Sequence, residues 1–146
     1  GAMKLETTHL ALDKVDIYTN PSEAKWIKEV IEKIDLYSQE GDAILALPLN
    51  PIFYFLSGRV NPTPYEWILP GMLEEDKEKE LVAILNNNPP KLVIYVDIAI
   101  DGKEERRLLH YAPHLYKFLL DRYGFQEKVG FFQILLPKNS PSPLDF

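Results

Sequence analysis

The chain has 146 residues, no cysteine and a formal net charge of -6, and these facts exclude several classes of protein. Its length fits one domain, and its 46% hydrophobic and 26% charged residues are typical of a globular rather than a disordered chain. The acidic charge argues against nucleic acid as a partner, because such binding depends on cationic contacts to phosphate. The lack of cysteine excludes disulfides, thiolate catalysis and Cys-based zinc sites.

The two ends of the chain are interpreted separately from the folded part. Residues 1–3, Gly-Ala-Met, are interpreted as a cloning remnant, so we expect the native protein to continue upstream of Lys4. Residues 4–137 are predicted to form a single α/β domain, and residues 138–146, with their Ser-Pro-Ser-Pro sequence, a disordered C-terminal tail. Since no run approaches the roughly 18 apolar residues of a membrane span, we expect the fragment itself to be soluble.

A strand and a long helix are predicted before residue 41. Alternation over residues 15–18 indicates a short, half-buried strand. Asn20, Pro21 and Glu23 then supply a helix cap, a first-position proline and a capping-box acid. Apolar residues recur behind this start at i, i+3, i+4 and i+7, which predicts one helix face packed on a sheet; they are Ile27, Val30, Ile31 and Ile34.

An apolar run and a second helix start follow. Residues 43–47 do not alternate, which is typical of a short strand covered on both faces. Asn50 and Pro51 repeat the signal of a cap followed by proline. They predict a short helix over residues 52–56 that Gly58 ends, because glycine readily takes the left-handed conformation of a helix C-terminus.

The centre of the chain contains a proline-rich turn, a long helix and another buried strand. The prolines of residues 61–64 require an extended or turning backbone. Residues 74–87 predict a helix with an acidic first turn, which suits the helix dipole, and with Leu81, Ile84 and Leu85 on its apolar face. Residues 92–96 read as a continuous apolar strand, and residues 101–107 as a charged surface loop.

The last third of the chain predicts a helix and a closing hairpin. The helix begins near Pro113, carries Leu115, Phe118 and Leu119 inward and ends at Gly124. Residues 125–129 and 131–136 then read as two strands around Gly130. Helices alternating with apolar strands indicate an α/β fold, specifically a three-layer sandwich with a mainly parallel central sheet and an antiparallel C-terminal hairpin.

Few residues offer catalytic chemistry. The glycine signatures of phosphate-binding loops and the G-x-S-x-G nucleophile elbow are both absent. Ser57 is better interpreted as a hydroxyl at a helix end than as a nucleophile, since no histidine lies near it in sequence. His110 and His114 have the i, i+4 spacing of a metal pair, but Pro113 is expected to start a helix between them and separate their side chains. No catalytic residue, metal site or cofactor is assigned.

Acidic residues give two weaker candidates. The carboxylates between residues 74 and 80 have the charge to hold a cation, yet the interleaved Lys77 and Lys79 favour a solvated helix start. Asp97 follows the predicted strand at its carboxyl end, where a carboxylate can do acid–base work. A helix cap or a hydrogen bond within a loop is the simpler role for Asp97.

The densest cluster of aromatic, Arg and Asn residues follows the strand predicted at 43–47, and ligands of open α/β sheets usually bind beyond such strand ends. Arg59 either pairs with a buried carboxylate or offers its guanidinium fork to a phosphate or carboxylate ligand. Asn61 and Thr63 either bind a ligand or only organise the turn. The aromatic residues at 53–55 are more often core than a stacking platform, but one short helix cannot bury all three.

The same stretch carries a family resemblance. Residues 42–65, from Asp-Ala-Ile-Leu-Ala-Leu-Pro to Phe-Tyr-Phe-Leu-Ser-Gly-Arg-Val-Asn-Pro-Thr-Pro-Tyr, resemble the extracytoplasmic C-terminal domain of bacterial multi-spanning membrane glycosyltransferases. These enzymes are relatives of the dolichyl-phosphate-mannose protein mannosyltransferases. The likeness extends to Asn-Asn-Asn-Pro-Pro-Lys-Leu-Val-Ile-Tyr at 86–95 and to the ending at 123–136, and its most specific part is Phe-Leu-Ser-Gly-Arg-x-Asn-Pro-Thr.

The resemblance implies a parent enzyme that transfers a sugar from a polyprenyl-phosphate donor, with its catalytic carboxylate in a loop between membrane helices outside this fragment. The fragment would then not catalyse transfer alone, but would cap the membrane active site or help to bind substrate. It would lie on the extracytoplasmic (periplasmic or cell-exterior) face of the bacterial inner membrane. Its partners would be the membrane-spanning part of the same chain and a lipid-linked sugar or acceptor, contacted by Arg59, Asn61 and Tyr65. The alternative is an independent α/β ligand-binding or protein-interaction module.

Overall fold

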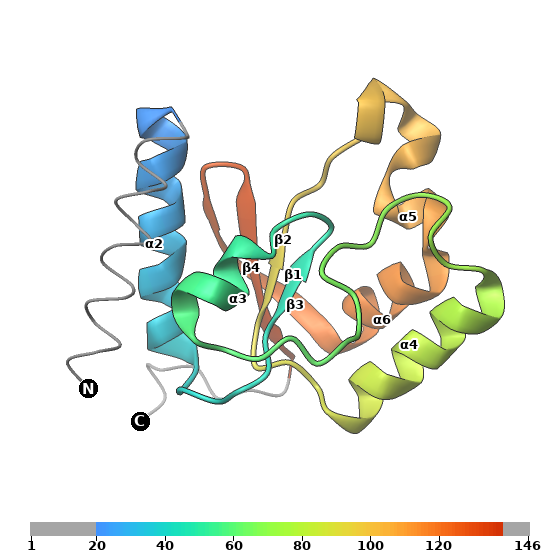
Figure 1. The fold of residues 1–146 in the computed structure, drawn as a ribbon, viewed down its shortest axis with the longest axis horizontal. Coiled ribbons are helices and arrows are strands. Elements are labelled where there is room, and N and C mark those ends of the chain that lie inside the picture. Colours follow the sequence, from blue (N-terminus) through green and yellow to red (C-terminus); the bar gives the residue numbers. More distant parts are fainter. Residues whose placement is uncertain (1–19, 139–146) are drawn as a thin grey trace.

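The computed structural model describes residues 20–138, which form a four-stranded mixed sheet with helices on both sides (Figure 1). The order of the strands is β1-β2-β4-β3, with bounds β1 (Leu45–Leu47), β2 (Val93–Tyr95), β3 (Tyr123–Val129) and β4 (Phe132–Pro137). β1 and β2 run parallel, while the other two neighbouring pairs are antiparallel. The α/β class and the C-terminal hairpin are confirmed, but the sheet is parallel in one strand pair only, because the hairpin adds both of its strands antiparallel.

Five helices occur in the described part of the chain. They are α2 (Pro21–Tyr37), α3 (Ile52–Ser57), α4 (Glu75–Asn87), α5 (Leu108–Tyr111) and α6 (Pro113–Arg122), and two short 3-10 turns precede α5, η1 (Ile100–Gly102) and η2 (Glu104–Arg106). The start of α2 is confirmed, since Asn20 Oδ1 accepts a hydrogen bond from Glu23 N at 2.8 Å. The predicted cap of α3 is wrong, because Pro51 rather than Asn50 takes that position and no side chain bonds to it. Gly58 ends α3 as predicted, with a φ of 69°.

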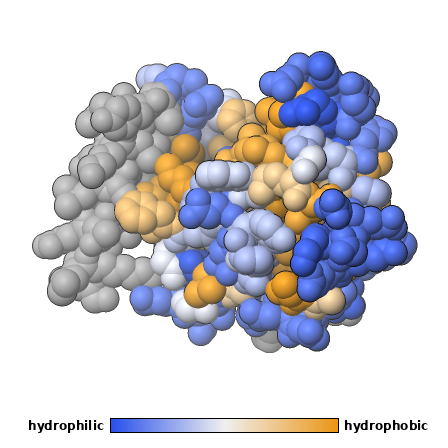
Figure 2. Space-filling model, turned by 45° about the vertical axis from the view of Figure 1, so that its right-hand side comes forward, coloured by the Kyte–Doolittle hydropathy of each residue, from blue (hydrophilic) through white to orange (hydrophobic). Residues whose placement is uncertain are grey.

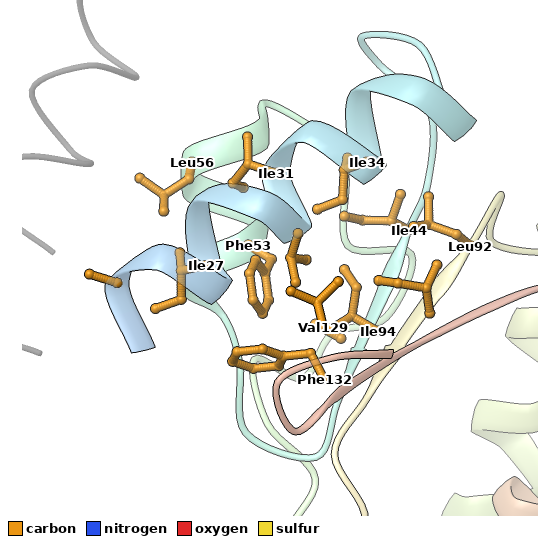
Figure 3. Packing of buried hydrophobic residues seen from close by; sticks show 14 residues of the cluster. Ile27, Ile31, Ile34, Ile44, Phe53, Leu56, Leu92, Ile94, Val129 and Phe132 are labelled. Atoms are coloured by element: carbon orange, nitrogen blue, oxygen red, sulfur yellow. The ribbon is translucent and has the colours of Figure 1, made fainter. Parts of the chain in front are cut away.

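One apolar cluster lies between α2, α3 and the sheet (Figure 3). Because side chains alternate across a strand, the middle residues Ala46 of β1 and Ile94 of β2 point to this side. Phe53 of α3 meets Phe132 of β4 edge to face, with ring centroids 5.2 Å apart. The apolar face predicted for α2 is confirmed, with Ile27, Val30, Ile31 and Ile34 all buried in this cluster.

A second apolar cluster covers the opposite face of the sheet. The flanking residues of the same two strands point this way; they are Leu45, Leu47, Val93 and Tyr95. Leu81 and Leu85 of α4 and three residues of α6 complete the cluster, and the α6 residues are the predicted Leu115, Phe118 and Leu119. The sheet therefore separates two helical groups, α2 with α3 and α4 with α6, as Figure 1 shows.

Several local predictions differ from the structure. Ile84 is 37% exposed, and Glu78 takes the third buried position of α4 instead. Helix α5 lies within a segment for which no helix was predicted, and α6 ends at Arg122 because β3 begins at Tyr123. Lys138, predicted to open a disordered tail, donates from its backbone N to Arg122 O at 3.0 Å and from Nζ to Leu120 O at 2.7 Å.

Three further predictions lie outside the described residues. They are the cloning remnant at 1–3, the strand at 15–18 and the rest of the tail at 139–146. Within residues 20–138, no helix combines the length and the apolar character that crossing a bilayer requires.

Candidate functional site

Arg59 lies between the last turns of α2 and α3. Its Nε donates to Ser38 Oγ at 2.9 Å, Nη1 donates to Ser57 O at 2.9 Å, and Nη2 donates to Ser38 O at 3.0 Å. Nη2 also pairs with Asp35 Oδ1 at 3.2 Å; the Arg59 side chain is 4% exposed and that of Asp35 is 62% exposed. These contacts match the structural alternative for Arg59, except that its carboxylate partner is exposed. A ligand contact by Arg59 stays a prediction.

Asn61, Thr63 and Tyr65 form one hydrogen-bonded turn. Asn61 Oδ1 accepts from both the backbone N and the hydroxyl of Thr63 at 2.9 Å, and Asn61 Nδ2 donates to Tyr65 O at 2.6 Å. Tyr65 O lies 3.0 Å from Thr63 Oγ1 and is a second acceptor within reach of its single proton, and Thr63 Oγ1 accepts from Tyr65 N at 3.1 Å. Asn61 and Thr63 therefore organise the turn, as their structural interpretation required, and Tyr65 packs half-buried against the second apolar cluster. Ligand contacts by Asn61 and Tyr65 stay predictions.

After this turn, the chain runs beside the carboxyl ends of the two parallel strands. Ile68 N donates to Pro48 O at 3.0 Å, just beyond β1, and Ile68 O accepts from the Tyr111 hydroxyl at 2.7 Å. Val96 N, just beyond β2, donates to Leu47 O at 2.9 Å. Residues 42–65 and the carboxyl ends of β1 and β2 thus belong to one neighbourhood, where open α/β sheets usually bind their ligands.

Polar side chains gather at this edge of the sheet. Arg107 Nη1 donates to Asp97 Oδ1 at 3.1 Å, and Arg107 Nε donates to Glu104 Oε2 at 2.7 Å. The Tyr95 hydroxyl donates to Asp97 Oδ1 at 3.4 Å, and, beside burial, the nearby Tyr111 hydroxyl contributes to the raised pKa of Tyr95. We call these five residues the edge cluster; they are Tyr95, Asp97, Glu104, Arg107 and Tyr111. Asp97 thus hydrogen-bonds within a loop, as its simpler role required.

Hydrogen bonds, nearby charges and burial shift the pKa values of four residues of the edge cluster. The hydrogen bond from Arg107 lowers the pKa of Glu104, and the same bond raises the pKa of Arg107. Burial, with the nearby Asp97 charge, raises the pKa of Tyr95 well above its ordinary value. Burial also raises the pKa of Tyr111 to about 12. Near neutral pH the two tyrosines stay protonated, with their hydroxyl protons donated to Ile68 O and Asp97 Oδ1, and Arg107 and Glu104 stay charged. These groups are poorly matched to proton transfer.

Large apolar side chains are exposed beside the edge cluster. Leu49 follows β1 and is 40% exposed, Ile98 follows β2 and is 41% exposed, and Trp67 precedes Ile68 and is 44% exposed. Figure 2 shows apolar patches that interrupt an otherwise hydrophilic surface on one side of the molecule. Sequence reasoning considered Asp97 but missed Trp67 and the other four members of the edge cluster as candidates. The position of Trp67, two residues beyond Tyr65, was the signal available for finding it.

The remaining candidates have structural partners or are dispersed. Ser57 is buried at the end of α3, where its Oγ accepts from Arg59 N at 3.1 Å. His114 Nε2 lies 3.2 Å from Glu75 Oε1 and His110 Nε2 lies 3.7 Å from Glu104 Oε1, so the two rings have different partners. No group of three His, Asp or Glu residues within positions 20–138 is arranged to hold a metal ion.

Comparison of the chain with family models, with curated proteins and with solved structures finds no match. The resemblance carried by residues 42–65 therefore stays a prediction. The geometry itself describes a rigid hydrogen-bonded turn that leads to a polar and aromatic edge beyond two parallel strands.

Proposed function

We propose that the chain is a soluble accessory domain of a membrane-embedded glycosyltransferase that uses a polyprenyl-phosphate-linked sugar donor. In this proposal the domain lies on the extracytoplasmic face of the bacterial inner membrane and is not catalytic alone. It caps the active site or aids substrate binding, together with the membrane-spanning part of the same chain. We also propose the three-layer sandwich as its fold class, supported by the two apolar clusters on the two faces of the sheet.

The observation that supports this function best is that the residues of the resemblance build one connected unit. Gly58 ends α3, Arg59 holds the last turns of α2 and α3 together, and Asn61 and Thr63 fix the turn that ends at Tyr65. These residues place one loop beside the carboxyl ends of two strands. A loop held in this way can be presented to a substrate or to a neighbouring domain.

The chemistry of the edge cluster favours binding over catalysis. Arg107 and its exposed carboxylate partners can exchange hydrogen bonds with the hydroxyls of a sugar, and the exposed face of Trp67 suits its apolar side. The perturbed groups of the cluster hold their protons or charges near neutral pH. This pattern fits a domain that aids substrate binding while the reaction proceeds elsewhere.

A first experiment tests the parent enzyme. The native gene should encode several apolar segments of about 20 residues upstream of Lys4, as a multi-spanning membrane protein requires. The intact protein, reconstituted in lipid vesicles with a polyprenyl-phosphate-linked sugar, should transfer that sugar to an acceptor. A native gene product without apolar segments would overturn the proposal.

A second experiment tests the edge in that intact enzyme. Trp67→Ala should lower the transfer rate about tenfold, because it removes one aromatic contact to the substrate. Phe125→Ala, which removes another exposed aromatic ring from β3 at the opposite edge of the sheet, should leave the rate unchanged. Thermal melting of both variants controls for folding, and equal transfer rates for the two variants would remove Trp67 from the site.

One observation favours the alternative, an independent protein-interaction module. Phe55 is 72% exposed on α3 and Val60 is 49% exposed just beyond that helix, so the short aromatic helix presents an apolar surface. Phe53 does not belong to this surface, because it is buried against Phe132. In this alternative Phe55→Ser abolishes association measured by size and leaves stability intact. If the unmodified chain and the Phe55→Ser variant are both monomers, this alternative is contradicted.

A further inference from the structure

Two adjoining hollows lie along the packed helices α4 and α6. The first has a volume of about 410 Å³ and the second a volume of about 330 Å³, and both are lined by Asp121 and Arg122. We call the combined depression the α4/α6 groove. It reaches Pro89, just before β2, so it lies at the amino end of this strand, whereas the edge cluster follows the carboxyl end.

The groove is basic although the chain is acidic. Its lining includes four lysine or arginine side chains against one carboxylate, Asp121; they are Lys79, Lys117, Arg122 and Lys138. The whole chain carries a formal charge of -6, so this concentration of positive charge runs against the overall balance. A basic depression on an acidic protein attracts an anion locally.

Arg122 lines both hollows of this groove. Within residues 20–138 its side chain makes no ion pair, while its backbone oxygen accepts from Lys138 N at 3.0 Å. Lys79 pairs with Glu75 and Lys117 pairs with Asp121, but all four side chains are more than half exposed. Such exposed pairs contribute little net energy, so both lysines can turn to a stronger anionic partner.

Helix dipoles do not account for this arrangement. Cations are expected near the last turns of helices, where the carbonyl groups are unpaired, and Arg122 ends α6. However, Lys138 Nζ already donates to Leu120 O at 2.7 Å in that last turn. Lys79 and Lys117 lie in the middle of α4 and α6, away from either C-terminus.

The groove also offers an apolar wall and an amide. Val82 is half-buried and Phe118 is buried, and both line the first hollow beside Asn86. We propose that the α4/α6 groove binds a phosphate group, which Arg122 holds with its guanidinium fork and which Lys79 and Lys117 neutralise. Asn86 donates a hydrogen bond to the same group or its ester, and the apolar wall covers the part of the ligand attached to it.

The test uses the 146-residue chain and inorganic pyrophosphate as the probe, titrated at low ionic strength by calorimetry and by amide chemical shifts. Saturable binding is expected, with shifts confined to α4, α6 and the start of β3. Arg122→Gln and Lys117→Gln should each weaken binding about tenfold, because each removes a charged hydrogen-bond donor to phosphate. Lys128→Gln is the matched control, since it removes one exposed lysine near the far end of β3.

A second arm distinguishes two sources of the phosphate. Vesicles of phosphatidylglycerol and of phosphatidylcholine are offered to the chain and to the same variants. Binding to phosphatidylglycerol alone, sensitive to Arg122→Gln, identifies a lipid headgroup, and tighter binding of pyrophosphate identifies a small phosphorylated molecule. The proposal is overturned if neither probe binds saturably, or if Lys128→Gln weakens binding as much as Arg122→Gln. These outcomes are independent of sugar transfer by the parent enzyme.

Discussion

Arg59 connects two helices through a buried guanidinium, and its replacement should therefore act on stability. Arg59→Met removes the guanidinium donors to the backbone oxygens of Ser57 and Ser38 and to Ser38 Oγ, of which the Ser57 oxygen lies in a buried contact. We expect a loss of about 2–4 kcal/mol in the free energy of unfolding, measured by urea denaturation. Asp35→Asn removes only the exposed partner and should cost less than about 1 kcal/mol.

Equal stabilities of these two variants would show that the guanidinium contributes no more than a surface charge. This prediction also limits functional tests at Arg59. A loss of activity after its replacement has two sources, a lost ligand contact and a weakened domain, and thermal melting must separate them.

Gly130 is required by its conformation and by a close contact. Its φ is +59°, and an added Cβ would lie 2.1 Å from Cδ2 of Trp26, whose ring lies over this turn. Gly130→Ala should cost about 2–4 kcal/mol, because overpacking adds to the strain of the left-handed backbone. Gly41→Ala is the matched control, since its φ is +87° and nothing lies within 4 Å of an added Cβ. A chevron or urea curve that places both variants at the same stability contradicts the role of Trp26.

At the level of elements, Glu78 joins α4 to α6. Its side chain is buried, at 3% exposure, and Glu78 Oε2 accepts from Leu115 N at 2.9 Å in the first turn of α6. The carboxylate therefore satisfies one of the amide groups that a helix start leaves unpaired. Glu78→Ala should cost about 1–3 kcal/mol, because it leaves that buried amide without a partner.

Two measurements check this role of Glu78. The amide of Leu115 should exchange its hydrogen faster in Glu78→Ala, while Glu78→Gln, which keeps an acceptor oxygen, should retain most of the protection. Glu80→Ala serves as the control, since Glu80 is exposed and pairs with Lys77. Unchanged exchange at Leu115 in Glu78→Ala would show that another group caps α6.

At the level of the whole molecule, buried tyrosines determine the alkaline limit of stability. Burial raises the pKa of Tyr54 and of Tyr111 to about 12, and it also raises the pKa of Tyr95 and of Tyr123. The ordinary pKa of a tyrosine hydroxyl is 10.0, so the unfolded chain loses these protons before the folded chain does. The folded chain therefore holds these protons more tightly, and this stabilises it. The contribution to the free energy of unfolding is fully present below pH 10.0 and is lost as the pH rises toward 12.

We expect the free energy of unfolding to fall above about pH 10, by up to about 1.4 kcal/mol per pH unit for each such tyrosine. Urea denaturation between about pH 8 and about pH 11.5 measures this slope. Tyr54→Phe should reduce this pH slope by the share of one tyrosine, because one titrating hydroxyl is removed. The variant also loses the acceptor of Ala46 N and should be less stable at neutral pH. A flat pH profile would show that these hydroxyls are solvated in the folded protein.

Local signals in the sequence predicted most of the secondary structure. The cap at Asn20, the apolar period of α2 and the turn at Gly130 each depend on residues a few positions apart, and all three were placed correctly. The apolar face of α6 was also predicted, for the same reason. Local signals failed at α3, where Asn50 resembles a cap but contributes no side-chain bond.

By itself, the sequence determined the type and approximate position of the long elements, because helix period, proline and glycine act within one turn of the chain. Only the tertiary structure decided that the hairpin pairs antiparallel with β2, how Arg59 and Glu78 are satisfied, and that Asp97 meets Arg107. The α4/α6 groove belongs to the same group, since its lining comes from two helices and the ends of two strands. These features depend on contacts between residues distant in sequence, and such contacts form only when packed elements bring the residues together.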